Sequence, residues 1–246
     1  MPKSKVRPPD FKVPRAALMT WAFAHKGPNS DKYQYEIREN LQTVHFESSI
    51  EGARKDGIRK LHALATDGHR LLHVWWTALP TDVLEEGFEI EASAVDLFLR
   101  DLNQEKGSVL SRGKGHDFRI RTEGPNYVII AEDDDQPVAW VEAGLIEHNR
   151  LPFPEWRKVV PKWKEGETKY PTTLGVDFEY VIDFHRFLKE FGHGTQMKIC
   201  CPSVETESAM IFAPTVPSEE GEFEVDFLLL DQATAVEYIL MPVKLS

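Results

Sequence analysis

The sequence predicts an α+β protein built from three repeats of one unit, in which a short strand is followed by a helix and then by several antiparallel strands. Two observations carry this prediction. Short apolar runs, typical of strands, recur along the whole chain. Each of the three segments with helical spacing of apolar residues follows directly on such a run. The pattern also fits other α+β proteins with antiparallel sheets, because short apolar runs do not fix topology.

The first unit starts with the strand Phe11–Val13. Pro14 suits the first position of a helix, because its φ angle is already helical and it has no N–H to leave unbonded. Apolar side chains then recur at helical spacing up to Gly27, at Ala17, Leu18, Trp21 and Ala24. Three strands are predicted to follow, over Leu41–Glu47, Lys60–Thr66 and Arg70–Thr77.

The second and third units repeat this order. The strand Phe88–Glu91 leads into a helix with Ser93 as its predicted N-cap. Its predicted apolar face is Val95, Leu97, Phe98 and Leu102. The strands of the second unit are predicted over Ser108–Ser111, Phe118–Arg121, Tyr127–Ala131 and Val138–Val141. The third unit has a predicted strand at Thr173–Val176, a helix over Tyr180–Phe191, strands over Met197–Cys200, Ala209–Ala213, Phe223–Leu229 and Ala235–Pro242, and a solvated loop over Pro214–Gly221.

These units predict the domain organisation. Residues 1–10 form a flexible basic tail, and residues 11–150 form one domain of two units. Residues 151–171, rich in Pro, Lys and Trp, are a connector. Residues 172–246 are a single unit, half the size of the preceding domain.

Composition narrows the classes of protein that this chain can be. With 246 residues, of which 41% are hydrophobic, it can bury a substantial core. No run of about 18 apolar residues marks a membrane span, and no apolar segment follows the basic N-terminus as in a secretory signal. Cys200 and Cys201 are the only cysteines, and sequence neighbours pair only with strain, so we expect a reduced, cytoplasmic protein. The net charge of -11 argues against nucleic acid as a partner, but phosphate binding depends on local Lys and Arg and is not excluded.

Three separated segments carry the most specific signal. They are Ala-Thr-Asp-Gly-His-Arg-Leu at Ala65–Leu71, Phe-Pro-Glu-Trp-Arg-Lys-Val-Val-Pro at Phe153–Pro161, and Tyr-Ile-Leu-Met-Pro-Val-Lys-Leu at Tyr238–Leu245. Singly, each has an ordinary explanation, since Asp-Gly is a tight-turn signal and Met-Pro suits the end of an edge strand. In this order, and with Arg38–Glu47 and Gly175–Asp183, they resemble the bacterial DNA polymerase sliding clamp family, the β processivity subunit. The resemblance extends over most of the chain and implies the DNA-clamp fold, with antiparallel sheets and helices on one face.

The resemblance also exposes a difference in length. Family members have three similar domains, each of two units, and two chains close a ring. This chain has counterparts of the middle domain, residues 11–150, and of only the last unit of the final domain, residues 172–246. The absent parts make the dimer contact in the family, so a ring here needs another arrangement. Three units per chain suggest a tetramer, because the family ring has twelve units.

The resemblance implies a peptide-binding pocket between the middle and last domains, which accepts short linear motifs of polymerase and repair proteins. Aliphatic and Met side chains would hold Leu or Phe anchors, and Arg70, Lys158 and Lys244 would pair with acidic or polar flanks. Position 158 is Lys where the family more often has Arg, which puts a bidentate contact there in doubt. The matching residues are Leu41, Thr66, Gly68, His69, Arg70, Leu71, Pro154, Lys158, Val159, Ile239, Met241, Pro242, Val243 and Lys244.

Contact with duplex DNA is the second implication, because the family's helices line the hole of the ring. The basic residues on or near the predicted helices are Arg15, Lys26, Arg100, Lys106, Arg186 and Lys189. Such charges also occur on helices for solubility alone. The second helix starts with Glu91-Ala92-Ser93, where many clamps have basic residues, which weakens the prediction there.

No pattern in the chain indicates catalysis. Consecutive acids at Glu132–Asp135 would point in alternating directions and suit a solvated turn. His148, His185 and His193 lack metal-ligand spacing relative to one another, and the chain has no phosphate-binding loop or nucleophile motif. We therefore expect a protein that is not an enzyme and has no cofactor.

Two functional hypotheses remain. The first is a compact sliding clamp, a processivity factor that encircles duplex DNA as a homo-oligomeric ring and binds the replicative polymerase, repair proteins and a clamp loader. The second is an adaptor or decoy that keeps the peptide pocket and forms no ring. We prefer the clamp, because an isolated half-domain would expose apolar surface.

Overall fold

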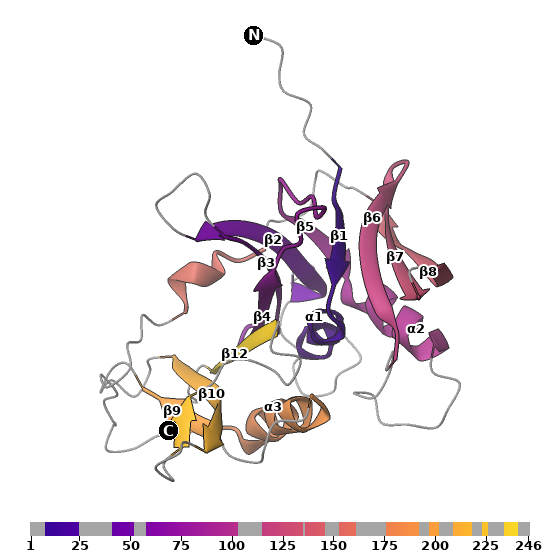
Figure 1. Cartoon of the computed structure of the whole chain (residues 1–246). Coiled ribbons are helices and arrows are strands. Elements are labelled where there is room, and N and C mark those ends of the chain that lie inside the picture. The colour runs from indigo at the N-terminus through magenta and orange to yellow at the C-terminus, as the bar shows by residue number, and fades with distance from the viewer. Residues whose placement is uncertain are drawn as a thin grey trace.

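The computed structural model describes residues 8–24, 41–51, 58–102, 115–134, 136–145, 153–160, 176–191, 197–201, 209–217, 223–225 and 234–240. It confirms the predicted fold class: the chain is α+β, with antiparallel sheets and few helices (Figure 1). In chain order, the described elements are β1 (Asp10–Val13), α1 (Arg15–Leu18), η1 (Met19–Phe23), β2 (Thr43–Glu51), β3 (Ile58–Thr66), β4 (Arg70–Thr77), β5 (Phe88–Glu91), α2 (Ala92–Leu102), β6 (Asp117–Glu123), β7 (Asn126–Asp133), β8 (Gln136–Leu145), η4 (Trp156–Lys158), α3 (Phe178–Glu190), β9 (Met197–Cys200), β10 (Met210–Pro217), β11 (Phe223–Val225) and β12 (Thr234–Leu240).

The strands form two sheets in which every pairing is antiparallel. One sheet has the order β1-β6-β7-β8, and the other has the order β11-β10-β12-β4-β3-β2-β5, with β9 also paired to β10. β1 joins strands that come much later in the chain, while β5 joins the earlier β2. The chain therefore runs from the smaller sheet, at β1, into the larger sheet and back to the smaller sheet at β6, which links the two sheets. The C-terminal part of the chain adds to the larger sheet because β12 pairs with β4, from Thr234↔Trp76 to Leu240↔Arg70.

Residues of α1, η1, α2 and α3 pack against the sheets and bury an apolar core. Phe11 is central to this core, with its ring 6.0 Å from Phe46 and 6.1 Å from Phe88. A second aromatic group joins α3 to the sheet and to η1, since Tyr238 of β12 lies 4.6 Å from Phe184 and 5.7 Å from Phe23. The helices that the structure describes are all too short or too polar to serve as transmembrane segments.

Three predictions about the first two helices were wrong in detail. The first helical segment is a single turn of α-helix, α1, continued by the 3₁₀ helix η1, rather than one longer α-helix. α2 begins at Ala92, so Ser93 lies inside the helix and is not its N-cap; the Ala92 N–H is bonded to the Gln42 carbonyl oxygen, and no side-chain cap is needed at that N–H. Leu97, predicted on the apolar face, is exposed, because Val95, Phe98 and Leu99 already fill the buried face.

The predicted loop Pro214–Gly221 was also partly wrong, because β10 continues through Pro217. Pro214 pairs with β9 and Pro217 with β11, and neither pairs with β12. A proline is tolerated where a strand pairs on one side only, since its missing N–H then breaks no ladder. The predicted strand Ser108–Ser111 lies outside the described residues, as do parts of those at Thr173–Val176, Phe223–Leu229 and Ala235–Pro242.

Candidate functional site

Residues from the three sequence motifs meet on one face of the larger sheet. Leu71 of β4 is paired with Thr66 of β3 on one side and with Ile239 of β12 on the other. The same face carries Phe153 and Trp156. We call the buried set Leu64, Leu71, Phe153, Trp156 and Ile239 the connector cluster.

The loop between β3 and β4 is closed by its own side chains. The Thr66 hydroxyl donates to the Arg70 carbonyl oxygen at 2.6 Å and accepts from the Gly68 N–H at 3.0 Å. The Asp67 carboxylate accepts from the N–H groups of His69 and Arg70 at 3.0 and 3.1 Å. Gly68 has a φ of +93°, which only glycine adopts without strain, and Leu41 lies directly against it. The Thr-Asp-Gly-His-Arg motif thus encodes a rigid loop at the margin of the connector cluster.

Arg70 is buried rather than presented at the surface. Its side chain is 6% exposed, and it donates from Nε to Asp67 at 2.9 Å and from Nη1 to Asp183 of α3 at 2.8 Å. The guanidinium also covers the rings of Phe23 and Tyr180, at 5.1 and 4.7 Å. Burial acts to lower the pKa of Arg70, but the surrounding Tyr238, Asp67 and Asp183 raise it above its ordinary value. Arg70 therefore stays charged and holds the loop against α3.

The connector segment is anchored to the sheet at two acidic side chains. Glu89 accepts from the Phe153 N–H at 2.9 Å, and the Phe153 ring stacks on His45 at 4.8 Å. Glu47 accepts from Trp156 Nε1 at 3.2 Å and pairs with Arg157. Burial acts to raise the pKa of Glu47, yet the hydrogen bonds from His45 and Arg157 lower it to about 2. The carboxylate is thus ionised over the whole ordinary pH range.

A chain of hydrogen bonds crosses four strands beneath Trp156. Ser49 Oγ lies 2.6 Å from His62 Nε2, His62 Nδ1 lies 2.9 Å from His73 Nε2, and His73 Nδ1 lies 2.7 Å from Glu237 Oε1. With one proton on each imidazole, every donor in this chain meets an acceptor. Burial, followed by repulsion from His73, lowers the pKa of His62 to about 3. The Trp156 ring covers His73 at 4.6 Å, so these polar groups form part of the support for the connector.

The predicted pocket residues fall into three groups. Those on the inside are Leu41, Thr66, Arg70, Leu71 and Ile239, all buried. Those at the surface are Gly68, His69, Pro154, Lys158 and Val159. Met241, Pro242, Val243 and Lys244 lie outside the described residues. Of the buried group, Leu71 and Ile239 belong to the connector cluster, whereas the Arg70 side chain contacts Asp183, Phe23 and Tyr180 instead.

The predicted DNA-contacting residues separate in the same way. Arg100, Arg186 and Lys189 are exposed on α2 and α3. Arg15 is mostly buried, paired with Glu190 at 3.1 Å and stacked over Phe191, and so it joins α1 to α3 instead of facing outward. Lys26 and Lys106 lie outside the described residues.

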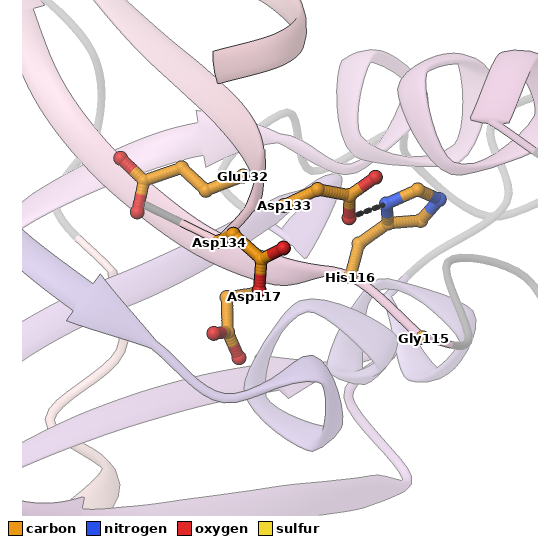
Figure 2. Close-up of a pocket in the computed structure, with 6 residues that line it drawn as sticks. All are labelled: Gly115, His116, Asp117, Glu132, Asp133 and Asp134. Atoms are coloured by element: carbon orange, nitrogen blue, oxygen red, sulfur yellow. Dashed lines mark hydrogen bonds and ion pairs between the residues drawn. The ribbon is translucent and has the colours of Figure 1, made fainter. Parts of the chain in front are cut away.

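A separate acidic hollow lies at the turn between β7 and β8, away from the three motifs. Its lining is Gly115, His116, Asp117, Glu132, Asp133 and Asp134, and Figure 2 shows His116 and Asp133 turned toward each other, 2.9 Å apart. Asp134 has a φ of +49°, as a hairpin turn residue often does. Of the acidic run, Glu132 and Asp133 end β7, Asp134 lies in the exposed turn after it, and Asp135 lies outside the described residues. Within the described ranges, no three His, Cys, Asp or Glu side chains are grouped to hold a metal.

Sequence reasoning missed the polar residues that support the connector. His45, Glu47, His62, His73 and Glu237 alternate with buried apolar residues along β2, β3, β4 and β12. Period-two alternation was the available signal, because it places these polar side chains together on the face opposite the main core. Phe153 and Trp156 of the connector were the second signal, because large aromatic side chains are usually buried against another part of the protein.

Comparison with solved structures identifies the fold. A DNA polymerase sliding clamp from Bacillus subtilis matches the chain with a TM-score of 0.53 at 9% sequence identity, over 100% of this chain and 67% of the other. A sliding clamp from Pseudomonas aeruginosa, solved bound to griselimycin, matches with a TM-score of 0.52 at 13% identity, over 100% of this chain and 68% of the other. No protein-family model and no curated protein sequence matches the chain.

The predicted resemblance is therefore confirmed at the level of the fold. The chain has the fold of the bacterial sliding clamps and spans about two thirds of their length.

Proposed function

We propose that this protein is a sliding clamp, a non-enzymatic processivity factor that encircles duplex DNA as a ring of identical chains. The observation that carries the proposal is the convergence of the three motif segments on one surface of a clamp fold. We further propose that this surface binds short peptide segments of the replicative polymerase, of repair proteins and of a clamp loader, in the cytoplasm.

The surface has the chemistry of a peptide-binding site. The connector cluster is a buried apolar support, and the exposed Pro154 and Val159 are the apolar side chains beside it that a peptide can reach. His69 stacks near Tyr180 at the loop side, and Lys158, which pairs with the exposed Glu155, lies at the connector side. Apolar anchors of a peptide would gain affinity by burial here, while acidic flanks would be favoured by Lys158.

In a clamp, α2 and α3 would be the helices that contact DNA. In the proposed ring, these helices face the duplex and present Arg100, Arg186 and Lys189. Few and exposed cations suit a protein that has to slide, since each tight phosphate contact adds to the salt-dependent affinity that would hold it in place. The net charge of -11 keeps the rest of the surface repelled from DNA.

A binding titration with a matched control tests the peptide site. The probes are griselimycin and a fluorescent peptide with a Leu-Phe pair flanked by acidic residues. Val159→Glu places a charge on the rim at a side chain that is 47% exposed, and Leu79→Glu makes the same change at a residue of equal exposure, 48%, elsewhere. We expect Val159→Glu to weaken binding about tenfold or more and Leu79→Glu to leave it unchanged. Equal binding by both variants would show that the peptide does not bind beside the connector cluster.

A further inference from the structure

The structure presents a cation on the connector cluster that the sequence motifs did not single out. Of the three basic residues predicted to pair with a peptide, Arg70 is buried, and Lys244 lies outside the described residues. The third, Lys158, is exposed but pairs with Glu155. Arg157 was not among the predicted residues, and its side chain is 55% exposed.

The guanidinium of Arg157 is held in place by two contacts. It lies 4.3 Å from the centre of the Trp156 ring, and its Nη2 pairs with Glu47 Oε1 at 2.5 Å. Arginine stacks well on an indole because its guanidinium is planar, charged and weakly hydrated. Glu47 also accepts from Trp156 Nε1 at 3.2 Å, so the carboxylate fixes the ring and the guanidinium together. A side chain that is already ordered loses little further entropy when a ligand binds to it.

Part of the hydrogen-bonding capacity of Arg157 is left over. A guanidinium has five N–H donors in a rigid fork. Within the part of the chain that the structure describes, Glu47 is the one acidic partner of Arg157, and it engages a single nitrogen. The other N–H groups belong to a side chain that is more than half exposed. Two parallel N–H groups match the two oxygens of a carboxylate, so the unused donors suit an acidic ligand.

Lys158 carries the same charge but lacks these properties. Its ammonium pairs with Glu155, and the two side chains are 76% and 73% exposed. The two residues are three apart and so share one face of the 3₁₀ turn η4. Glu155 offsets the charge of Lys158 toward an incoming carboxylate, and an ammonium group makes no bidentate contact. Lys158 is therefore a matched control for Arg157.

The stacked arginine lies next to the apolar rim of the connector surface. The Val159 N–H bonds to the Trp156 carbonyl oxygen at 3.0 Å. Residues three apart lie on one face of a 3₁₀ turn, so Val159 is on the same side of the turn as the indole that carries the guanidinium. A peptide with an apolar side chain at Val159 therefore brings its neighbouring residues toward Arg157.

We propose that Arg157 is the residue that selects peptides with an Asp or Glu side chain next to the apolar anchor, by holding that carboxylate with the unused N–H groups of its guanidinium. The inference rests on the proposed function, since it names the chemical class of peptide that the connector surface prefers. The pair with Glu47 stays intact, because the two acids use different N–H groups. Glu47 also offsets part of the positive charge, so the preference is modest.

A titration with two fluorescent peptides tests this role. Both contain a Leu-Phe pair and are amidated at the C-terminus; one has acidic residues beside the pair, and the other has glutamine in the same places. We expect the wild type to bind the acidic peptide about fivefold more tightly. Arg157→Met should reduce this ratio to about twofold or less, and Lys158→Met should leave it close to the wild-type value. Arg157→Lys should also lose most of the ratio, because lysine keeps the charge but not the planar fork.

The ratio of the two affinities separates recognition of the peptide from support of the connector. If Arg157 only held Trp156 in place, Arg157→Met would weaken both peptides together and leave the ratio unchanged. That result would overturn the inference. An equal loss of the ratio in Lys158→Met would overturn it too, because the preference would then come from local positive charge and not from one side chain.

The same titration keeps the inference apart from the proposed function. Equal, measurable binding of both peptides to the wild type would remove the role of Arg157 and leave the peptide site standing. Binding of neither peptide would overturn the peptide site and the inference together. The glutamine peptide with a free C-terminal carboxylate is a third probe. If it bound as tightly as the acidic peptide, and only while Arg157 was present, the arginine would recognise a chain terminus, which would contradict the assignment to an acidic side chain.

Discussion

Arg70 joins three parts of the chain through one guanidinium group. It bonds Asp67 in its own loop and Asp183 in α3, and it covers the rings of Phe23 and Tyr180. A buried cation with all its partners in place is tolerated, whereas the loss of one partner leaves the other charge uncompensated. The position of the loop beside the connector cluster therefore depends on this one side chain.

We expect Arg70→Met to destabilise the fold by about 3 kcal/mol, because it strands the partly buried Asp67 carboxylate. Arg186→Met is a matched control, since Arg186 also approaches Asp183, at 3.7 Å, but is largely exposed. Its effect should stay within about 0.5 kcal/mol. Urea denaturation followed by circular dichroism measures both. Equal losses for the two variants would show that burial of Arg70 adds nothing.

His62 makes the stability of the protein depend on pH. Its pKa is lowered to about 3 in the folded chain, while the unfolded chain has the ordinary value of about 6.5. Between these values the unfolded chain binds more protons, so stability falls as the pH falls below about 6.5. The loss between pH 8 and pH 5 amounts to about 2 kcal/mol from this residue.

His62→Asn removes the titrating group and keeps a donor close to the position of Nδ1. We expect the variant to lose less stability than wild type between pH 8 and pH 5, by about 2 kcal/mol. His45 acts in the opposite sense: burial opposes its protonation, but the acceptors Glu47 and Glu89 raise its pKa. Comparing the two proteins at both pH values cancels that contribution. Parallel urea midpoints across the pH range would contradict the assignment.

At the scale of elements, Glu47 is one of the two acidic side chains that hold the connector to the sheet. Glu47→Ala removes the acceptor of Trp156 Nε1 and the partner of Arg157. We expect the amides of 153–160 to exchange hydrogen about tenfold faster or more, equivalent to about 1.4 kcal/mol of local opening. Glu123→Ala is the control, as its pair with Arg121 is exposed on another sheet. Mass spectrometry of the exchanged peptides measures both variants, and unchanged exchange in 153–160 would show that packing and the Glu89 hydrogen bond hold the connector without Glu47.

The bounds of strands were predictable where the residues of the loop between them determine where one strand ends and the next begins. β4 has the predicted bounds, and β3 has the predicted end at Thr66, because Thr66, Asp67 and Gly68 close the loop by themselves. The burial of Arg70 was not predictable, because its partner Asp183 lies 113 residues away and only the pairing of β12 with β4 brings α3 beside the loop. The prediction that Leu97 is buried was wrong for a related reason. Helical spacing fits two overlapping faces of α2, and the position of the sheet against the helix determines which face is buried.

At the scale of the whole molecule, the proposed ring has to form from chains that are shorter than those of the solved clamps. The chain spans about two thirds of the length of the solved clamps that it matches. In the proposed ring, the helices of successive chains would form one row. The few exposed cations on that row, Arg100, Arg186 and Lys189, would then face the duplex. A loose, weakly basic lining predicts retention by topology rather than by affinity.

Retention on DNA distinguishes enclosure from binding. Dilute protein mixed with nicked circular DNA and then concentrated should assemble around the duplex. In about 1 M salt, where charges are screened beyond roughly 3 Å, we expect it to remain on the circle during gel filtration. Cutting the circle once should release it, and bulky blocks at both ends of the cut DNA should restore retention. Ordinary electrostatic binding gives a different result, because salt would then remove the protein from circular, linear and blocked DNA alike.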